Sequence, residues 1–495
     1  MSVTTIVNLS RRRFLRSSLA AGAGLTLGLH LPVHADPAAA GPGKAGSKIS
    51  GDTAFEPNAF VRIGADNSVT VIAKHLEMGQ GTYTGLATLV AEELDAAWEQ
   101  VRVEGAPADA ARYRNLYWGP AQGTGGSTAI ANSYEQMRRA GAAARAMLTA
   151  AAAARWQVQE AEIDVRDGIL SHAGSGNRAT FGELAGAAAE QPVPADVLLK
   201  DPAGFRLIGT RLPRKDSREK TNGSAGFTHD LRLPGMLTAC VAHPPLFGAS
   251  VKSVDAGAAK RVAGVVAVVE IPTGVAVLAR DTWGALTARD ALRIEWDEGG
   301  AFRLGSAEIL NDYRKLADKP GALARDEGDA ATTMKAAARV ITADYEFPFL
   351  AHAAMEPMDC VVQLKQDGCE IWNGEQMQTG DQAAVAAFLG IRPEQVRINM
   401  LYAGGSFGRR ANPKADYVLE AVSIARAYAD ADGDLVPVRM IWTREDDMRA
   451  GWYRPLYLHR IHAGLDGGNK PVAWQHRVVG QSIAAGTPFE GALVR

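Results

Sequence analysis

Residues 68–94 read SVTVIAKHLEMGQGTYTGLATLVAEEL, and this stretch carries the pattern on which the predicted fold depends. Apolar residues alternate with other residues over 68–74, which indicates a strand, and they recur at helical spacing over 86–94, which indicates a helix. The turn between them, 77–82, is called joint 1. A glycine turn at the start of a helix presents backbone N–H groups at the positive end of the helix dipole, so it suits a phosphate. Because glycine has no Cβ, a flat ring can also approach the main chain.

Two further stretches repeat this arrangement. Residues 122–128, joint 2, read QGTGGST and precede an alanine-rich segment that predicts a helix over 129–156, with Ser127 or Thr128 as its N-cap.

Residues 404–410, joint 3, read GGSFGRR between a strand-like segment over 396–401 and a predicted helix over 413–428. Its two arginines offer fork-shaped donors to an anion. A single joint of this kind is most often only a tight connection, but three in one chain favour a large phosphate-bearing cofactor. None of the three fits the nicotinamide fingerprint or the P-loop.

Composition excludes several classes of protein. The chain has 495 residues, 47% of them hydrophobic and 22% charged, which is typical of a soluble globular protein of several domains. This excludes a disordered chain, a coiled coil and a polytopic membrane protein. A net charge of −2 provides no basic field, so we expect no nucleic-acid partner. Three cysteines without a C-x-x-C motif exclude a zinc ribbon, c-type haem attachment and an iron–sulfur cluster held by this chain alone.

The N-terminus resembles an export signal. Residues 10–16 read SRRRFLR, an apolar segment follows over 17–31, and small residues precede Asp36. The paired arginines predict a twin-arginine signal peptide over 1–35. An ordinary secretory signal or a basic amphipathic helix is the alternative. We therefore expect a periplasmic protein and leave membrane association and cleavage of the signal open. Residues 36–56 read as a linker.

The rest of the chain divides by composition. Short β-rich runs punctuated by turn residues predict a compact α+β domain over 204–300, and a polar, helix-prone connector follows over 301–337. From residue 338 onward a larger α+β pattern resumes. Cys360 and Cys369 lie in apparently adjacent strands, where they form either a disulfide or two buried thiols.

Three motifs together resemble one family. They are EMGQG at 77–81, AHAAMEP at 351–357 and GSFG at 405–408, and in this order they are similar to the molybdenum hydroxylases of the xanthine oxidase superfamily. The order of parts and the leader are similar to the branch of isoquinoline 1-oxidoreductase beta subunits and aldehyde oxidase molybdopterin-binding subunits. The similarity covers 57–495.

The resemblance implies a fold. It is a multidomain α+β molybdopterin-binding subunit with an inserted hammerhead-like α/β domain. A molybdopterin-binding segment over 57–190 comes first, the hammerhead-like domain takes 204–300, and a molybdopterin-binding domain takes 338–495. Family members run further, so we expect this chain to be C-terminally truncated, with that last domain incomplete.

The resemblance also implies a cofactor, molybdenum–molybdopterin, in this branch usually as the cytosine dinucleotide. Gln376 would hydrogen-bond an oxygen ligand of the metal, and the backbone N–H groups of Phe407 and Gly408 would contact the oxo group or the phosphate tail. The pterin sulfurs hold the metal, so no protein ligands are predicted for it. The implied cofactor-binding residues are Gly79, Gln80, Gly81, Thr124, Gly125, Gly126, Ser127, Thr128, Gln376, Gly405, Ser406, Phe407, Gly408 and Arg409.

The implied activity is that of an oxidoreductase that hydroxylates N-heterocycles or aldehydes with water as the oxygen source. Because the chain has no cluster, flavin or haem motif, electrons would leave through a small [2Fe-2S] subunit to an acceptor such as a cytochrome c. The general-base glutamate of the family is expected beyond residue 495, and neither Glu356 nor Glu375 is adopted in its place. Ser406 stands where the superfamily usually has a third glycine. A catalytically inactive cofactor scaffold or an exported binding protein remains the alternative.

Structural explanations compete for several residues. His352 and Glu356 are either functional or a buried polar pair beside a proline turn. Trp442 and Met448 are expected in the core rather than around a substrate. His75 is expected to cap the end of a strand.

Overall fold

The computed structural model describes residues 55–487 and residue 490. The predicted signal over 1–35 and all but the end of the linker over 36–56 lie outside these residues. Of the described residues, 55–315 and 348–454 form a larger compact unit, and 316–347 with 455–487 and 490 form a smaller one. Both units combine helices and strands, in agreement with the predicted α+β class.

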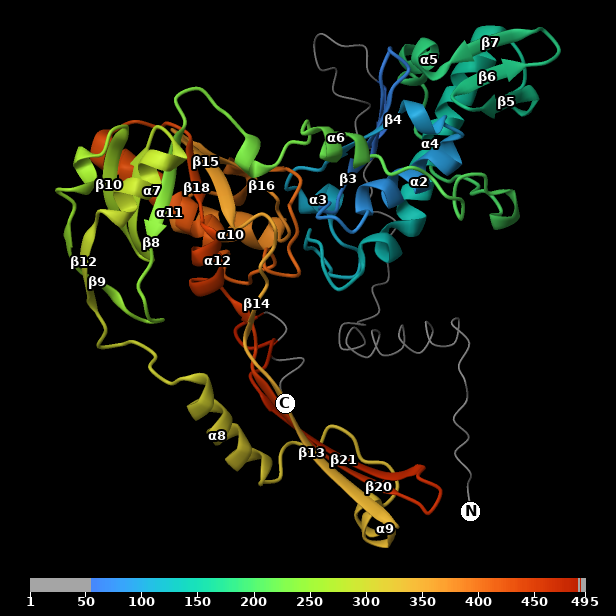
Figure 1. The fold of residues 1–495 in the computed structure, drawn as a ribbon. Coiled ribbons are helices and arrows are strands. Elements are labelled where there is room, and N and C mark those ends of the chain that lie inside the picture. The colour runs from blue at the N-terminus through green and yellow to red at the C-terminus, as the bar shows by residue number, and fades with distance from the viewer. Residues whose placement is uncertain (1–54, 488–489, 491–495) are drawn as a thin grey trace. The chain divides into compact units, whose positions relative to one another are not determined.

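One sheet of the larger unit is built around the stretch 68–94. Its strand order is β1-β2-β3-β4, and only the β3–β4 pair is parallel. Helix α2 (Thr82–Leu94) connects these two parallel strands, and the long helix α4 (Ala129–Trp156) packs against α2 (Figure 1). The strand bounds are β1 (Phe55–Asn58), β2 (Val61–Ile63), β3 (Val69–Ala73) and β4 (Val101–Gly105). The strand and helices expected over 68–74, 86–94 and 129–156 are confirmed.

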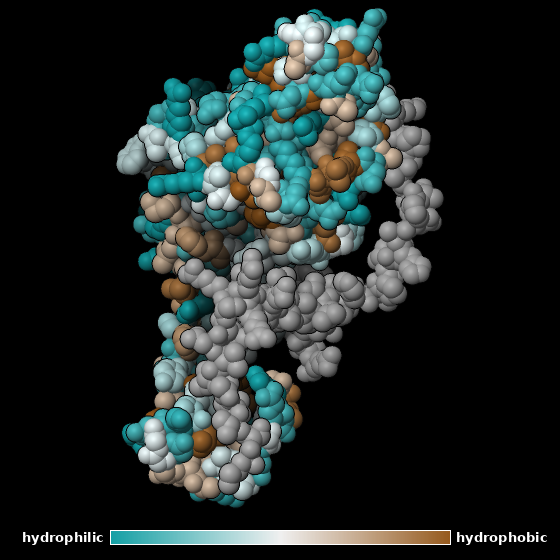
Figure 2. Space-filling view, turned by 90° about the vertical axis from the view of Figure 1, so that its right-hand side faces the viewer, coloured by the Kyte–Doolittle hydropathy of each residue, from teal (hydrophilic) through white to brown (hydrophobic). Residues whose placement is uncertain are grey.

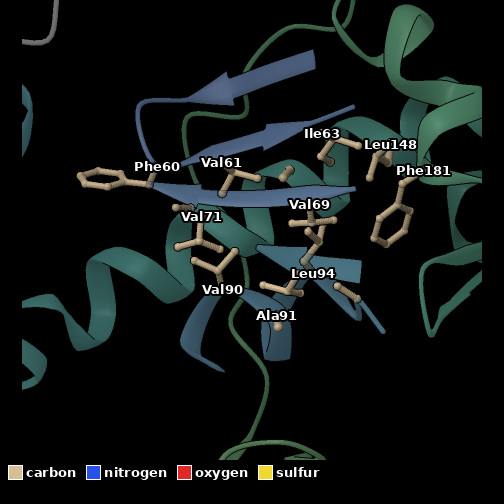
Figure 3. Close-up of a cluster of buried hydrophobic side chains, with 14 of the residues drawn as sticks. Phe60, Val61, Ile63, Val69, Val71, Val90, Ala91, Leu94, Leu148 and Phe181 are labelled. Carbon is tan, nitrogen blue, oxygen red and sulfur yellow. The ribbon is translucent and has the colours of Figure 1, made fainter. Parts of the chain in front are cut away.

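A single apolar core joins this sheet to the helices. Val69 and Val71 on β3 are fully buried, as are Val90 and Leu94 on α2 (Figure 3). Phe181, at the start of helix α5 (Phe181–Ala188), belongs to the same cluster. Each such side chain contributes roughly 1.5–3 kcal/mol by leaving water, so this core fixes where joint 1 emerges.

A second sheet of the larger unit is mixed and seven-stranded, in the order β10-β11-β8-β18-β15-β16-β17. Its strands are β8 (Leu237–Ala242), β10 (Val265–Ile271), β11 (Gly274–Ala279), β15 (Asp359–Lys365), β16 (Gly368–Asn373), β17 (Val396–Met400) and β18 (Val438–Ile441). Helix α11 (Asp416–Asp432) packs on β15 and β10, and α10 (Gln378–Leu389) packs on β17 and α11.

This sheet crosses the predicted domain boundaries. Strands β8, β10 and β11 come from the segment 204–300, which the sequence marks as a separate domain, yet β8 pairs in parallel with β18. One edge of β8 pairs with β11 and the other pairs with β18, a strand some 200 residues later in the chain. Hydrophobic periodicity identifies a strand but not its partner, so the sequence does not reveal this pairing.

The remaining elements are shorter. The other helices are α3 (Ala110–Tyr113), α5 (Phe181–Ala188), α6 (Ser217–Asn222), α7 (Thr282–Asp290), α8 (Ser306–Ala317), α9 (Ala330–Ala336) and α12 (Arg444–Arg449). The other strands are β5 (Ile163–Arg166), β6 (Ile169–His172), β7 (Asn177–Thr180), β9 (Ser250–Asp255), β12 (Arg293–Asp297), β14 (Leu350–Ala351) and β19 (Tyr453–Arg454). In the smaller unit, β13 (Arg339–Phe347), β20 (Tyr457–Leu465) and β21 (Pro471–Gly480) form an antiparallel sheet. Helices α8 and α9 lie within the predicted polar connector over 301–337.

Two local expectations change. Helix α11 begins at Asp416 rather than 413, because the backbone N–H of Lys414 bonds the side chain of Asn412 (2.8 Å) and Ala415 is left-handed (φ 51°). Cys360 and Cys369 are free, buried thiols, because the β15–β16 register places Leu364 rather than Cys360 opposite Cys369.

One face of the molecule carries both hydrophilic and hydrophobic side chains (Figure 2). On the face drawn in Figure 2, hydrophobic side chains form several separate groups among hydrophilic ones. Within 55–487 and 490, no helix combines the length and the apolar character needed to cross a bilayer.

The α2–α4 packing predicts the effect of one glycine substitution. A Cβ at Gly141 would overlap the carbonyl oxygen of Val90 and lie 3.1 Å from Glu93 Cβ. We expect Gly141→Ala to lower the free energy of unfolding by about 1–3 kcal/mol through overpacking. Gly186 in α5 has open space around it, so Gly186→Ala is the control and should raise stability by up to about 1 kcal/mol. Urea unfolding followed by circular dichroism measures both, and equal effects would contradict the packing argument.

Candidate functional site

The three glycine joints lie together in the larger unit. The hydroxyl of Thr124 in joint 2 accepts a hydrogen bond from the backbone N–H of Leu76, beside joint 1 (2.9 Å). The amide of Gln376 donates through Nε2 to the Thr124 carbonyl (2.7 Å), and its Oε1 accepts from the Ser406 hydroxyl in joint 3 (2.6 Å). Ala403, the residue before joint 3, also donates its backbone N–H to the Glu77 carbonyl in joint 1 (3.1 Å). Segments more than 300 residues apart therefore meet in one hydrogen-bonded network.

Joint 1 differs from its predicted form. The buried Glu77 carboxylate accepts the backbone N–H groups of Gly79 (2.8 Å), Gly81 (3.2 Å) and Tyr83 (3.0 Å). The Arg214 guanidinium pairs with the same carboxylate at 3.1 Å. The Gly79 and Gly81 N–H groups, expected to be free for a phosphate, are thus bonded by the chain's own anion, because a helix N-terminus favours whichever negative charge lies nearest. Gln80 is exposed, and its Nε2 donates to the nearby Leu76 carbonyl (2.7 Å).

Joint 2 presents an exposed main chain. Gly126 and Ser127 are exposed and left-handed (φ 60° and 56°), and neither backbone N–H has a hydrogen-bond partner among the described residues. Thr128 occupies the N-cap position of α4, as predicted, but its hydroxyl does not cap the helix. It donates to the Gly125 carbonyl and accepts from Asn115 Nδ2, both at 2.8 Å.

His75 hydrogen-bonds both the main chain of joint 2 and the helix that follows it. Its Nδ1 lies 3.1 Å from the Gly123 carbonyl and its Nε2 lies 3.0 Å from Asn132 Nδ2, which defines a neutral ring with the proton on Nδ1. Complete burial, reinforced by the charge of Lys74, lowers the pKa of His75 to about 4. His75 therefore links the end of β3 to α4 rather than capping the strand alone.

Joint 3 exposes its tip and buries its base. Ser406 is buried, whereas Phe407 is 76% exposed and left-handed (φ 55°), a conformation that is uncommon for a bulky residue. Gly408 follows with φ 96°. The backbone N–H groups of Phe407 and Gly408 have no hydrogen-bond partner among the described residues. Strained, outward-facing backbone of this kind is typical of ligand-binding turns.

Both arginines of joint 3 are already paired. Arg409 is buried and holds both carboxylate oxygens of Asp416, at 3.1 and 2.8 Å. Arg410 is fully buried against Glu356 (2.8 Å) and Asp359 (3.4 Å). Neither guanidinium is free to meet an outside anion as the sequence suggests, since each neutralises a carboxylate of the chain. The role of Arg409 toward a cofactor stays a prediction.

Glu356 is tied to joint 3 and not to His352. Its Oε2 accepts the Gly404 N–H (2.7 Å) and the Arg410 guanidinium. Burial, followed by the charge of Asp359, raises the pKa of Glu356 to about 7, although Arg410 opposes this shift. His352 is half-buried, and burial lowers its pKa. In place of the buried His352–Glu356 pair considered from the sequence, Glu356 accepts a hydrogen bond from Arg410.

Sequence reasoning missed a second cluster beside Glu356. His229 Nε2 lies 2.9 Å from Asp359 Oδ2, and ligand atoms of His229, Glu356 and Asp359 lie within 4.8 Å of one another. That spacing could hold a metal ion, but Arg410 already places a positive charge between the two carboxylates. These residues are separated by up to 130 positions, so no motif announces the cluster.

Of the two residues expected in the core, one is buried and one is not. Trp442 is buried and its Nε1 donates to Glu420 (2.5 Å), as expected for a core residue, whereas Met448 is 44% exposed. Glu375 is fully buried beside Asp381, and burial with the charge of Glu375 raises the pKa of Asp381 well above its usual range.

Two family models match this chain. Residues 34–225 and residues 316–493 each match a molybdopterin cofactor-binding domain. The chain is 33% identical, over 98% of its length, to the beta subunit of isoquinoline 1-oxidoreductase from Brevundimonas diminuta, of which it covers 66%. It therefore belongs to the molybdenum hydroxylase family, as the motifs indicate.

One further relative and one solved structure are also similar to this chain. The chain is 29% identical, over 97% of its length, to a membrane-bound aldehyde dehydrogenase (pyrroloquinoline-quinone) of Gluconacetobacter polyoxogenes and covers 61% of it. Among solved structures, quinoline 2-oxidoreductase from Pseudomonas putida 86 aligns with a TM-score of 0.44 and 21% identity, over 55% of this chain and 39% of that one. The chain spans about two thirds or less of the length of these relatives.

The linking role of Gln376 predicts a loss of stability on substitution. Gln376→Leu removes both hydrogen bonds and leaves the Thr124 carbonyl and the Ser406 hydroxyl buried without this partner. We expect a loss of about 1–3 kcal/mol for each group left unsatisfied. Gln191→Leu is the control, since that half-buried side chain makes no hydrogen bond in the described structure, and it should change stability by no more than about 0.5 kcal/mol. Denaturant titration followed by tryptophan fluorescence compares the two. A Gln376→Leu protein as stable as the control would contradict the network.

Proposed function

We propose that this chain is the molybdopterin-binding subunit of an oxidoreductase that hydroxylates N-heterocycles or aldehydes with water as the oxygen source. The observation that carries the proposal is the meeting of joints 2 and 3 with the chain at joint 1, where Leu76 directly precedes that joint; the bonds run through Thr124, Gln376 and Ser406. Three glycine turns that merely connected strands to helices would have no need to converge. Their convergence suits one large ligand that contacts all three.

The available main-chain donors support this assignment. The unpartnered N–H groups of Gly126 and Ser127 lie at the start of α4, and those of Phe407 and Gly408 lie at the tip of joint 3. No neighbouring atom lies within 4 Å of the Cβ position of Gly408, so a ligand can approach its backbone closely. We assign the phosphate-bearing part of the cofactor to these four donors. Joint 1, whose donors Glu77 uses, contributes the open backbone at Gly79 instead.

The cofactor and the protein would have different roles in the reaction. The bound group would supply oxygen transfer from water and take up two electrons. This chain's residues hold and orient it, and Gln376 keeps one further N–H of its amide for a polar ligand atom, because the structure uses only one. We propose the cytosine dinucleotide as the form of the cofactor.

The partner and location follow as proposals. Because the sequence carries no cluster, flavin or haem motif, we propose a small [2Fe-2S] subunit as the electron acceptor and a carrier such as a cytochrome c after it. The relative from Brevundimonas diminuta is named as one subunit of its enzyme, which supports an assembly of several chains. The arginine-rich N-terminal segment supports export by the twin-arginine route to the periplasm.

Cofactor analysis tests the proposal. Chain purified from a host that makes molybdopterin cytosine dinucleotide should contain about one molybdenum atom and release CMP on acid hydrolysis. Gly408→Ala should lower the molybdenum content at least about tenfold, because a Cβ at φ 96° displaces the joint 3 N–H groups.

Gly390→Ala is the matched control for strain. Gly390 has φ 69°, has no neighbouring atom within 4 Å of its Cβ position and ends α10 rather than belonging to a joint. It should lose similar stability yet keep its molybdenum. A metal-free wild-type chain would favour the inactive scaffold, and equal molybdenum loss in both variants would refute the role of joint 3.

A further inference from the structure

One oxygen atom holds both ends of joint 3. Glu356 Oε2 accepts the backbone N–H of Gly404, the first residue of the turn, and the guanidinium of Arg410, the last. The Glu356 N–H in turn donates to the Gly404 carbonyl (3.1 Å). A Cβ at Gly404 would lie only 2.5 Å from Glu356 Cβ and 3.2 Å from its backbone nitrogen, so only glycine fits at this contact. The exposed donors of Phe407 and Gly408 lie between these two anchored ends.

The second oxygen of this carboxyl is left without a partner. Glu356 Oε1 is buried and has no hydrogen-bond partner among the described residues, and Asp359 lies beside the same carboxyl. An ionised Glu356 would place a second negative charge in a buried site where Asp359 already occupies part of Arg410. The oxygen without a partner is therefore the place for a proton, and the resulting O–H has the Asp359 carboxylate as its acceptor.

We propose that Glu356 is a positioning residue that keeps joint 3 closed while it is protonated and loosens the turn when it ionises. Opening lets water reach the carboxyl, which stabilises the charged form. The turn then loses the geometry that presents the Phe407 and Gly408 N–H groups. The consequence for cofactor retention rests on the proposed function, but the opening itself does not.

The pKa of Glu356 sets the direction in which pH shifts the equilibrium between the closed and the open turn. The pKa of Glu356 is raised from its ordinary value of 4.5 to about 7 in the closed turn. A carboxyl that holds its proton more tightly in the closed state favours closure at low pH, and that preference is lost as the pH rises from about 4.5 to about 7. Above about 7 the effect is complete.

Other titratable groups face the same site. They are Asp359 on β15, His229 before β8, Arg439 on β18, Arg410 and the Tyr417 phenol, with Asp447 on α12 toward Arg410. Burial opposes the charge on His229, but Asp359 raises its pKa above the ordinary value. His229 is therefore the competing source of any pH dependence, and the experiment must separate it from Glu356.

Hydrogen–deuterium exchange of the full chain without cofactor tests the proposal directly. After correction for intrinsic exchange rates, protection of the 404–410 peptide should fall by about one to two orders of magnitude between pH 5 and pH 8. Glu356→Gln, a neutral isostere, should make protection independent of pH and close to the wild-type value at pH 5. Glu190→Gln, at an exposed site after α5, should keep the wild-type pH dependence.

Two results would overturn the proposed role of Glu356. Protection of 404–410 that does not change with pH in the wild type overturns the proposal without any variant. So does a pH dependence that survives Glu356→Gln but disappears in His229→Gln. If the wild-type chain carries no molybdenum but shows the expected pH dependence, the proposed function fails and this inference stands. If molybdenum is present and protection does not vary with pH, the reverse holds.

Discussion

A single buried carboxamide connects the parts of this site. Gln376 donates to the main chain of joint 2 and accepts from the hydroxyl of joint 3, so neither turn can shift without leaving a buried polar group unpaired. Its own position comes from the end of β16 and the start of α10 in the second sheet. Through Gln376, the packed core therefore fixes the positions of these turns.

The chain satisfies much of the site's electrostatics internally. Glu77 takes the N-terminal donors of α2, Asp416 takes Arg409, and Glu356 with Asp359 takes Arg410. What remains for a ligand is backbone rather than side chain, chiefly the outward N–H groups of joints 2 and 3. Main-chain donors fixed by sheets and helices need little reorganisation when an anion binds, which is the advantage of building a cofactor site this way.

Local patterns predicted local structure well. The strand before joint 1 and the helix over 129–156 were predictable because apolar spacing directly reflects which face of an element is buried. The beginning of α11 was not, because an Asx turn at Asn412 replaces the first predicted turn of helix. The shared sheet of β8 and β18 was not either, since strand pairing across 200 residues leaves no periodic trace.

The sequence by itself determined the glycine joints, their order and their likeness to the molybdenum hydroxylases, because these are properties of neighbouring residues. Only the tertiary structure decided which donors stay free. Arg409 and Arg410 read as anion receptors until Asp416, Glu356 and Asp359 are seen to hold them. Charge pairing depends on distances of a few ångströms between residues far apart in the chain, and no spacing along the sequence encodes such a distance.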